Sequence, residues 1–219
     1  MPTALYPSVT VCNHPLVQHN LSVLRDKTTS NELFRRAMNR VGLFVFQEAA
    51  RNLPLTRAII ETPICKTEAN ILSPEVPIII SPILRAGLML ADVAMDVLPS
   101  ASVYHIGLYR DEETLKPVTY YNKLPSNLDY SHARIFLLDP MLATGGSAVA
   151  AAEIIQKLGV KPENITFVCV IAAPEGIENL TKNFPGVKIY TGSVDERLNE
   201  KAYIVPGLGD AGDRTFGTV

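Results

Sequence analysis

The chain has 219 residues, of which 47% are hydrophobic and 19% charged, which predicts a single globular domain, residues 1–219, with a sizeable core. Its formal net charge is −2 and neither half is strongly basic, which argues against nucleic acid or an anionic membrane as the main partner. No apolar run approaches the ~18 residues that a membrane-spanning helix needs.

The first third of the chain has helical periodicity. Residues 14–27 repeat their apolar positions at helical spacing. Thr29 and Glu32 match a T-x-x-E capping box, which predicts a second helix from there to about Asn52. The apolar stripe of that helix is expected at Leu33, Ala37, Val41 and Phe44. We therefore expect residues 1–55 to form a helical extension that covers one side of the domain or pairs with a second copy.

After this helical part, the pattern of apolar residues changes. Residues 56–64 read as a strand, and from Val76 short apolar runs alternate with helical segments of about ten residues. This alternation predicts an α/β fold, with a mostly parallel sheet and helices on both faces. The polar, Tyr-rich residues 109–128 interrupt the pattern and predict a protruding β-hairpin flap, whose acidic run 111–113 is expected to be solvated.

The segment "RIFLLDPMLATGGS" ends an apolar strand on Asp139 and continues with residues of little bulk. Ligands of open α/β sheets bind beyond the carboxyl ends of the strands, where Asp139 lies. Ala143, Gly145 and Gly146 let backbone N–H groups approach an anion, and a helix is expected to begin at about Ser147. These features favour a phosphate cradle over an ordinary turn. The Walker lysine is absent, which argues against ATP hydrolysis.

A second glycine-rich stretch, "GLGDAG" at 207–212, matches the dinucleotide pattern G-x-G-x-x-G. That pattern needs a following helix and an acid about 20 residues further on, but only seven residues follow Gly212. We therefore expect a tight loop that faces a ligand, with a plain surface turn as the alternative.

Several segments together resemble one family. "DPMLATGGS" resembles the phosphoribosyl pyrophosphate (PRPP) loop of the phosphoribosyltransferases, in the version typical of the uracil phosphoribosyltransferases. "PILRAG", "YRDEET", "AAPEGI" and "YIVPGLGDAGDRTFGT" resemble that family's segments in its order, from about His14 to the end. The resemblance implies transfer of phosphoribosyl from PRPP to N1 of uracil, giving UMP and pyrophosphate.

The resemblance also implies the site residues. PRPP would be bound by Arg85, Arg110, Asp139, Pro140, Met141, Leu142, Ala143, Thr144, Gly145, Gly146, Ser147 and Asp210. Arg85 is expected to bind pyrophosphate, Arg110 to reach PRPP from the flap, and Asp139 to bind ribose hydroxyls.

Uracil is expected at the C-terminal segment, residues 203–219. Backbone groups of Ile204, Gly209, Asp210 and Ala211 would match its acceptor–donor–acceptor edge. Asp210 is the candidate catalytic residue, either assisting removal of the N1 proton or ordering Mg²⁺-PRPP. An orotate enzyme would need a cation for the carboxylate, and residues 204–212 contain none.

Partners and location follow from the same observations. Mg²⁺ is expected to arrive bound to PRPP, without a dedicated protein metal site. The family forms homo-oligomers, so at least a dimer is expected, and GTP, which activates some relatives, is a candidate effector. Three distant cysteines and no signal-peptide pattern predict a cytoplasmic protein without disulfides. The competing functions are a regulator that uses the same fold and an enzyme for another nucleobase.

Overall fold

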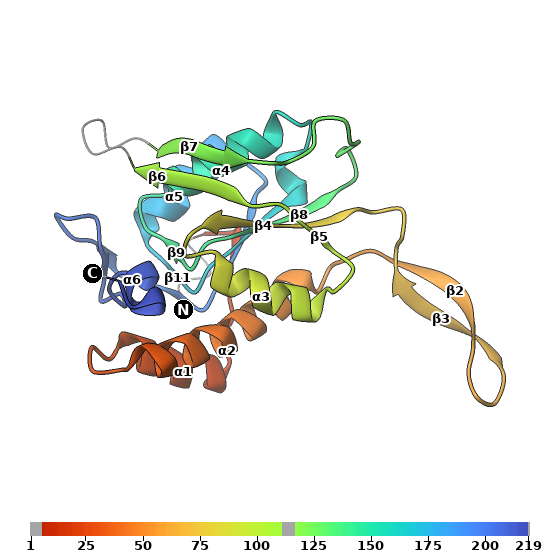
Figure 1. Cartoon of the computed structure of the whole chain (residues 1–219), viewed down its shortest axis with the longest axis horizontal. Coiled ribbons are helices and arrows are strands. Elements are labelled where there is room, and N and C mark those ends of the chain that lie inside the picture. Colours follow the sequence, from red (N-terminus) through yellow and green to blue (C-terminus); the bar gives the residue numbers. More distant parts are fainter. Residues whose placement is uncertain (1–5, 111–116, 219) are drawn as a thin grey trace.

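The structure is a computed structural model that describes residues 6–110 and 117–218, and its described part is built on one long sheet (Figure 1). The strand order is β1-β12-β10-β8-β4-β6-β7, with β5 beside β4. Neighbours are parallel except for β6 and β7, which pair antiparallel. The strands are β1 Val9–Val11, β4 Ile78–Leu84, β5 Ser102–Val103, β6 Ile106–Arg110, β7 Pro117–Asn122, β8 Arg134–Leu138, β10 Ile165–Val168 and β12 Lys188–Thr191.

Three neighbouring strands break and then continue into a second, smaller parallel sheet. Its order is β13-β11-β9. The bounds are β9 Met141–Leu142, β11 Ile171–Ala172 and β13 Ser193–Val194. At the break, Asp139 donates its backbone N–H to Val168 O at 3.2 Å, and Pro140 O accepts from Val170 N at 2.9 Å. The chain therefore leaves the main sheet at Asp139.

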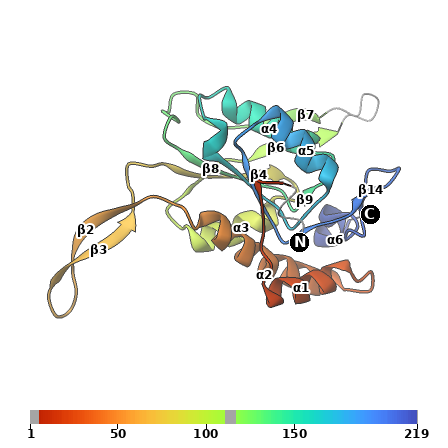
Figure 2. The ribbon, with the colours of Figure 1, turned by 180° about the vertical axis from the view of Figure 1, so that it is seen from behind.

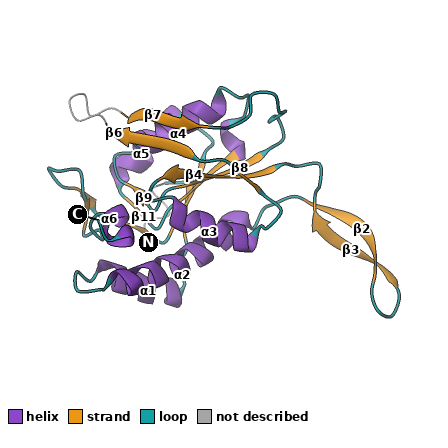
Figure 3. Cartoon of the chain, in the orientation of Figure 1, coloured by secondary structure: helices purple, strands orange, loops and turns teal. Residues whose placement is uncertain are grey.

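Helices cover both faces of the main sheet, as Figures 2 and 3 show. Buried residues from one group of helices form one apolar cluster, and those from a second group form another on the opposite face. The first group is α1 Pro15–Arg25, α2 Asn31–Ala50, α3 Leu88–Val97 and the short α6 Ala211–Phe216. The second is α4 Gly146–Gln156 and α5 Pro174–Asn183, and a 3₁₀ turn spans Pro162–Asn164. The predicted α/β fold is confirmed.

The start of the second helix differs from the sequence-based expectation. Ser30, not Thr29, is its N-cap, and its Oγ accepts from Leu33 N at 3.4 Å. The Thr29 hydroxyl instead donates to Val23 O at 2.7 Å. Of the predicted stripe, Ala37 and Val41 are buried and Phe44 is half-buried, but Leu33 is 53% exposed and Phe34 is buried instead. The predicted T-x-x-E capping box is wrong, because the third residue after the N-cap Ser30 is Leu33 and not a glutamate.

The N-terminal segment packs on the domain itself. Helices α1 and α2 share an apolar cluster with α3 and with the strands beneath them. The segment also contains a strand that the helical expectation for residues 1–55 did not include, since Val9–Val11 pairs with β12 at the sheet edge.

Residues 55–72 form a two-stranded arm that projects away from the sheet (Figure 1). Its strands are β2 Leu55–Glu61 and β3 Lys66–Leu72, which pair antiparallel. Only the first was expected. The arm exposes large apolar side chains: Leu55, Ile59, Ile60, Ile64, Ile71 and Leu72.

The expected flap corresponds to the antiparallel pair β6–β7, at the edge of the main sheet opposite β1. Residues 111–116, including the acidic run 111–113, lie outside the described residues. Within the described residues, none of the helices has the length and apolarity needed to cross a membrane.

Candidate active site

A pocket of about 340 Å³ lies beyond the carboxyl ends of the central strands and joins three distant parts of the chain. The first part follows β4, the second follows β8, and the third is the C-terminal segment. The lining residues are Ala86, Asp139, Met141, Ala143, Lys201, Ala202, Tyr203, Gly209, Asp210, Ala211 and Gly212.

Strand register and close packing bring these parts together. Leu138 at the end of β8 pairs with Val168 at the end of β10 and with Pro82 of β4, which continues to Leu84, so the three strands end at the same edge of the sheet. At the start of α3, an added Cβ on Gly87 would lie 2.4 Å from Leu138 O. A glycine there lets the loop after β4 pack directly against the end of β8.

Asp139 lies at the floor of this pocket, and its environment disfavours the charged form. Its Oδ1 accepts a hydrogen bond from Met141 N at 3.3 Å. Burial raises the pKa of Asp139 from its ordinary 3.8 to about 7, the nearby Asp210 carboxylate adds to the rise, and the Met141 hydrogen bond opposes it. A carboxylate held in this way gains from a cationic or hydroxyl-bearing ligand, as expected for ribose binding.

The loop after Asp139 runs through β9 to the first turn of α4, with backbone N–H groups at the helix start. Gly145 has φ of +76° and precedes α4 as its N-cap. An added Cβ on Gly145 would lie 2.8 Å from Gly176 O, so its bare side faces α5 rather than the pocket. Gly146 is open, its nearest neighbour being Thr144 Oγ1 at 3.6 Å. The two glycines of this loop thus have different functions. Gly145 lets the loop pack closely on α5, and Gly146 leaves the other side of the loop open.

The other predicted members of this loop have mixed positions. Met141 and Ala143 line the pocket, whereas Pro140 and Leu142 are buried. Ser147 is exposed in the first turn of α4, and the backbone O of Thr144 accepts from Asn179 Nδ2 at 2.8 Å. These four residues take part in the loop without lining the pocket.

The C-terminal loop supplies the opposite wall. Asp210 is exposed and caps α6, with Oδ1 accepting from Asp213 N at 2.9 Å. Gly209, Ala211 and Gly212 line the pocket beside it. Ile204 lies in β15, Ile204–Val205, which pairs with β14, Arg197–Leu198. Its side chain is buried in the core beside α1 and α2 and does not line the pocket.

A buried carboxylate fixes this loop to the N-terminal helices. Asp195 accepts a two-pronged ion pair from Arg25 of α1, at 2.6 and 2.7 Å. It also accepts from Ser193 Oγ at 2.8 Å and from Gly207 N at 3.0 Å. Burial works against the charged form, but these donors together lower the pKa of Asp195. Arg25 in addition donates to Gly207 O at 2.9 Å.

Two more arginines tie the end of the chain to the same helices. Arg214 of α6 donates to Leu24 O, to Leu208 O at 2.8 Å and to Asp26 O at 2.6 Å. Its guanidinium lies 4.4 Å from the centre of the Phe34 ring of α2. Arg35 of α2 donates to Thr215 O at 2.9 Å. The N-terminal helices thus hold the wall of the pocket, a role that the sequence analysis did not find.

The two arginines predicted to bind PRPP differ in how far the structure describes them. Arg85 is exposed at the rim, just before Ala86, with Nη2 3.8 Å from Asp213 Oδ1 and its guanidinium 6.0 Å from the Phe216 ring. It therefore belongs to the site region without lining the pocket. Arg110 ends β6 and pairs with Pro117 through the backbone, and its side chain lies outside what the structure describes.

Sequence reasoning gave no individual role to Ala86, which lies in "PILRAG", or to Lys201, Ala202 and Tyr203, the last of which opens the predicted base-binding segment. The last three form the tip of the β14–β15 hairpin, where Asn199 Oδ1 accepts from Lys201 N at 3.0 Å and from Tyr203 N at 2.9 Å. Two strands of two residues each leave little periodicity for a sequence to reveal. Lys201 also removes one reason for excluding orotate, because it brings a cation to the pocket from outside residues 204–212.

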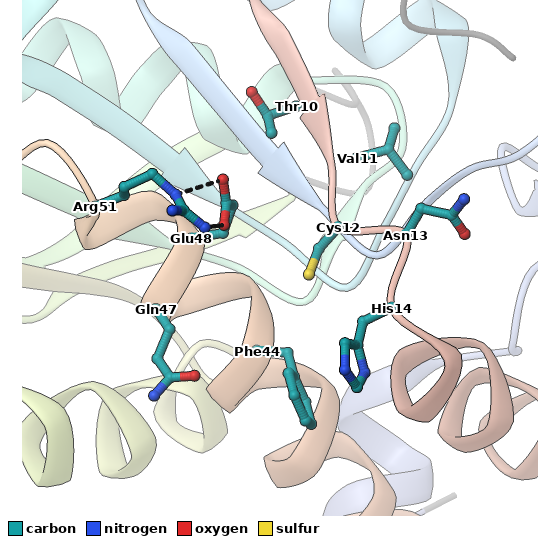
Figure 4. Close-up of a pocket in the computed structure, with 9 residues that line it drawn as sticks. All are labelled: Thr10, Val11, Cys12, Asn13, His14, Phe44, Gln47, Glu48 and Arg51. Atoms are coloured by element: carbon teal, nitrogen blue, oxygen red, sulfur yellow. Dashed lines mark hydrogen bonds and ion pairs between the residues drawn. The ribbon is translucent and has the colours of Figure 1, made fainter.

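A second pocket of about 360 Å³, shown in Figure 4, contains none of the predicted site residues. It lies between the end of β1 and one face of α2. His14 stacks on Phe44 with ring centres 4.5 Å apart, and Arg51 pairs with Glu48 at 2.5 and 2.9 Å. The two aromatic rings thus stack on each other and the two charged groups form an ion pair, and neither pair includes a predicted site residue. We therefore place the active site in the first pocket.

Comparisons with known proteins identify the family of the chain. The family described as uracil phosphoribosyltransferase matches residues 11–218. A uracil phosphoribosyltransferase of Lactococcus lactis is 52% identical over 95% of this chain and 97% of that protein. One of Dictyoglomus thermophilum is 53% identical over 96% of this chain and 99% of that protein.

Solved structures give the same result at the level of the fold. The AQ2163 protein of Aquifex aeolicus aligns with a TM-score of 0.86 and 39% identity, over 95% of this chain and 97% of that one. The adenine phosphoribosyltransferase of Giardia lamblia shares the fold, with a TM-score of 0.51 and 18% identity over 73% of this chain and 80% of that one.

Proposed function

This chain belongs to the uracil phosphoribosyltransferase family, and from that premise we propose that it transfers phosphoribosyl from PRPP to N1 of uracil. The bond between the anomeric carbon and the pyrophosphate oxygen breaks, and pyrophosphate leaves with the electron pair. The bond from N1 to the anomeric carbon forms, N1 loses its proton, and UMP results. The observation that carries the proposal is the pocket that joins Asp139 to the Gly209–Gly212 loop.

Each wall of the pocket has one task in this reaction. The loop from Met141 to Ser147 binds the 5′-phosphate through backbone N–H groups at the start of α4. Asp139 accepts hydrogen bonds from ribose hydroxyls, and its negative charge favours the cationic sugar of an oxocarbenium-like transition state. The opposite wall presents uracil to the anomeric carbon, and closeness and orientation then lower the barrier.

The residues present also fit a Mg²⁺ ion that enters with PRPP. Mg²⁺ binds through one or two carboxylates together with substrate phosphates, and two carboxylates, Asp139 and Asp210, line this pocket. When bound, Mg²⁺ neutralises charge on the leaving pyrophosphate. Asp139 and Asp210 would hold and orient the complex, and Arg85 at the rim would bind the pyrophosphate.

The test is pyrophosphate release from PRPP and Mg²⁺ with a panel of nucleobases. Uracil should be used best. Cytosine reverses the hydrogen-bonding roles at N3 and position 4, and each mispaired buried group costs about 1–3 kcal/mol, which gives ~10²–10⁴ in kcat/KM. Orotate and hypoxanthine should be poor substrates. Equal use of orotate, or no release with uracil, would contradict the proposal.

The competing function, a regulator with the same fold, receives less support. Such proteins bind nucleic acid through a basic face, and this chain has a net charge of −2. Turnover of uracil in the assay above separates the two. GTP stays a prediction for this chain, and adding it to the same assay tests it.

We further propose that the enzyme is at least a dimer, with the arm β2–β3 packed on a second copy. A two-stranded hairpin alone is marginally stable in water. This one exposes Ile59 by 70% and Ile64 by 91%, and monomers rarely leave so many large apolar side chains together in solvent. A second copy would cover them.

A further inference from the structure

Lys201 is the residue of the pocket whose chemistry the proposed reaction has not yet used. It lies at the tip of the β14–β15 hairpin, between the ends of Arg197–Leu198 and Ile204–Val205. Its backbone N–H donates to Asn199 Oδ1 at 3.0 Å, and Ala202 N donates to Asn199 O at 2.9 Å. The tip is therefore fixed to its own strand, and the position of Lys201 at the pocket is set by hydrogen bonds.

The charges around the pocket make this lysine distinctive. Of the described residues that line it, Asp139 and Asp210 are acidic and Lys201 alone is basic. None of the ion pairs between described residues involves Lys201. Lys201 is an exposed residue at the border of the pocket, where its flexible side chain can reach a ligand.

Tyr203 and the Gly209–Gly212 loop place Lys201 on the side of the base. Both line the pocket with it, and Tyr203 N shares the Asn199 Oδ1 acceptor. The phosphate loop and Arg85, by contrast, follow β8 and β4. Lys201 thus belongs to the wall that we assign to the base rather than to the pyrophosphate.

The base needs positive charge at one moment of the reaction. As N1 of uracil attacks the anomeric carbon, its proton is lost, and the negative charge that develops spreads over N1, O2 and O4. A fixed cation aimed at charge that develops in the transition state accelerates the step, more strongly once a bound substrate has displaced water.

We propose that Lys201 is a catalytic residue, which contacts the uracil ring and stabilises the negative charge that the base acquires as N1 is deprotonated. This rests on the proposed function and adds to it a residue for nucleophile activation. The proton itself leaves to Asp210 or to water, and the Lys201 ammonium stays protonated throughout.

The experiment compares uracil with 5-fluorouracil in the full-length enzyme, using Lys201→Gln and Lys201→Arg. Fluorine withdraws electrons and makes N1–H more acidic, so the fluorinated base depends less on an external cation. Lys201→Gln should lower kcat/KM for uracil about tenfold and for 5-fluorouracil less than about threefold, as expected for charge stabilisation near a surface. Lys201→Arg keeps the charge and should recover most of the activity.

The matched control is Lys161→Gln, an exposed lysine before β10 at the opposite end of the strands, which should leave both substrates unchanged. Equal losses for the two bases would overturn the proposal, because a misplaced hairpin affects both alike. So would unchanged activity of Lys201→Gln. A wild-type enzyme inactive with uracil would instead contradict the proposed function, so the two failures are distinguishable.

Discussion

At the scale of one residue, the burial of the Asp139 carboxylate in the site lowers the stability of the folded chain. In the folded chain its pKa is about 7, against 3.8 for an ordinary aspartate. The folded state therefore holds a proton more tightly than the unfolded state. Between pH 3.8 and about 7 the unfolded chain binds fewer protons, so this residue lowers the free energy of unfolding as the pH rises.

Asp139→Asn should therefore stabilise the protein while removing activity. The pKa change corresponds to about 4 kcal/mol at most, and partial exposure of the carboxylate reduces it, so we expect a gain of about 1–2 kcal/mol at pH 8. Urea unfolding of both proteins at pH 5 and pH 8 measures this, and the gain should be larger at pH 8. A less stable variant at pH 8 would show that the Asp139 carboxylate is stabilised by its surroundings.

Activity should follow the same carboxylate. Since the charged form of Asp139 binds the ribose and favours the cationic sugar, kcat/KM for PRPP should fall as the pH drops below about 7. Asp139→Asn should lose this limb of the pH profile together with most of the activity. A wild-type profile that stays flat from pH 8 to pH 5.5 would contradict the assignment.

Asp210 should matter more to chemistry than to folding. Its Oδ1 caps α6, and asparagine caps a helix about as well, so Asp210→Asn keeps the loop and removes the charge. We expect a loss of roughly 10²-fold in kcat with a nearly unchanged Tm. The rate of a single turnover at saturating substrates is the measurement, and an unchanged rate would leave Asp210 as a helix cap only.

At the scale of the element, the phosphate loop has two glycines with different tasks. Gly145→Ala places a Cβ 2.8 Å from Gly176 O at a φ of +76°, so it should destabilise the protein by about 1–3 kcal/mol. Gly146→Ala meets nothing closer than 3.6 Å, so it should fold normally and weaken PRPP binding. Thermal unfolding and PRPP titration of both variants test the pair, and a normal Tm for Gly145→Ala would contradict the packing role.

The same loop shows what a sequence can and cannot predict. The strand before Asp139, the helix after it and the small residues between them follow from local pattern, and the structure confirms them. Gly145 must lack a side chain because α5, about 30 residues further on, packs against it. A local sequence pattern cannot predict such a long-range contact. Likewise, the N-cap of α2 is Ser30 rather than Thr29, and the sequence alone does not distinguish two adjacent residues that cap helices about equally well.

The hairpin tip illustrates a second limit. Lys201 and Tyr203 line the pocket because two very short strands pair and Asn199 ties the turn. Such short strands have no recognisable periodicity, and Lys201 lies just before the family motif, which begins at Tyr203. The sequence alone therefore did not predict that Lys201 lies at the pocket.

At the scale of the whole molecule, the arm β2–β3 determines how copies associate. Ile59→Asp and Ile64→Asp together replace two exposed apolar side chains with charges, which a second copy cannot cover without cost. We expect the mass measured by light scattering to fall to that of one chain, with the domain still folded by circular dichroism. Thr67→Asp, an exposed polar position on the same arm, is the control. An unchanged mass would mean that the arm is not the interface.

The grip of the N-terminal helices on the C-terminal segment has a consequence for protein synthesis. Arg25, Arg35 and Arg214 join the first fifty residues of the chain to its last twenty-five by hydrogen bonds to Gly207, Thr215, Leu24 and Asp26. A chain is synthesised from its N-terminus, so α1 and α2 are made well before the segment that they hold. A growing chain thus cannot form the base-side wall of the pocket until residues 207–215 have been added and can reach these helices.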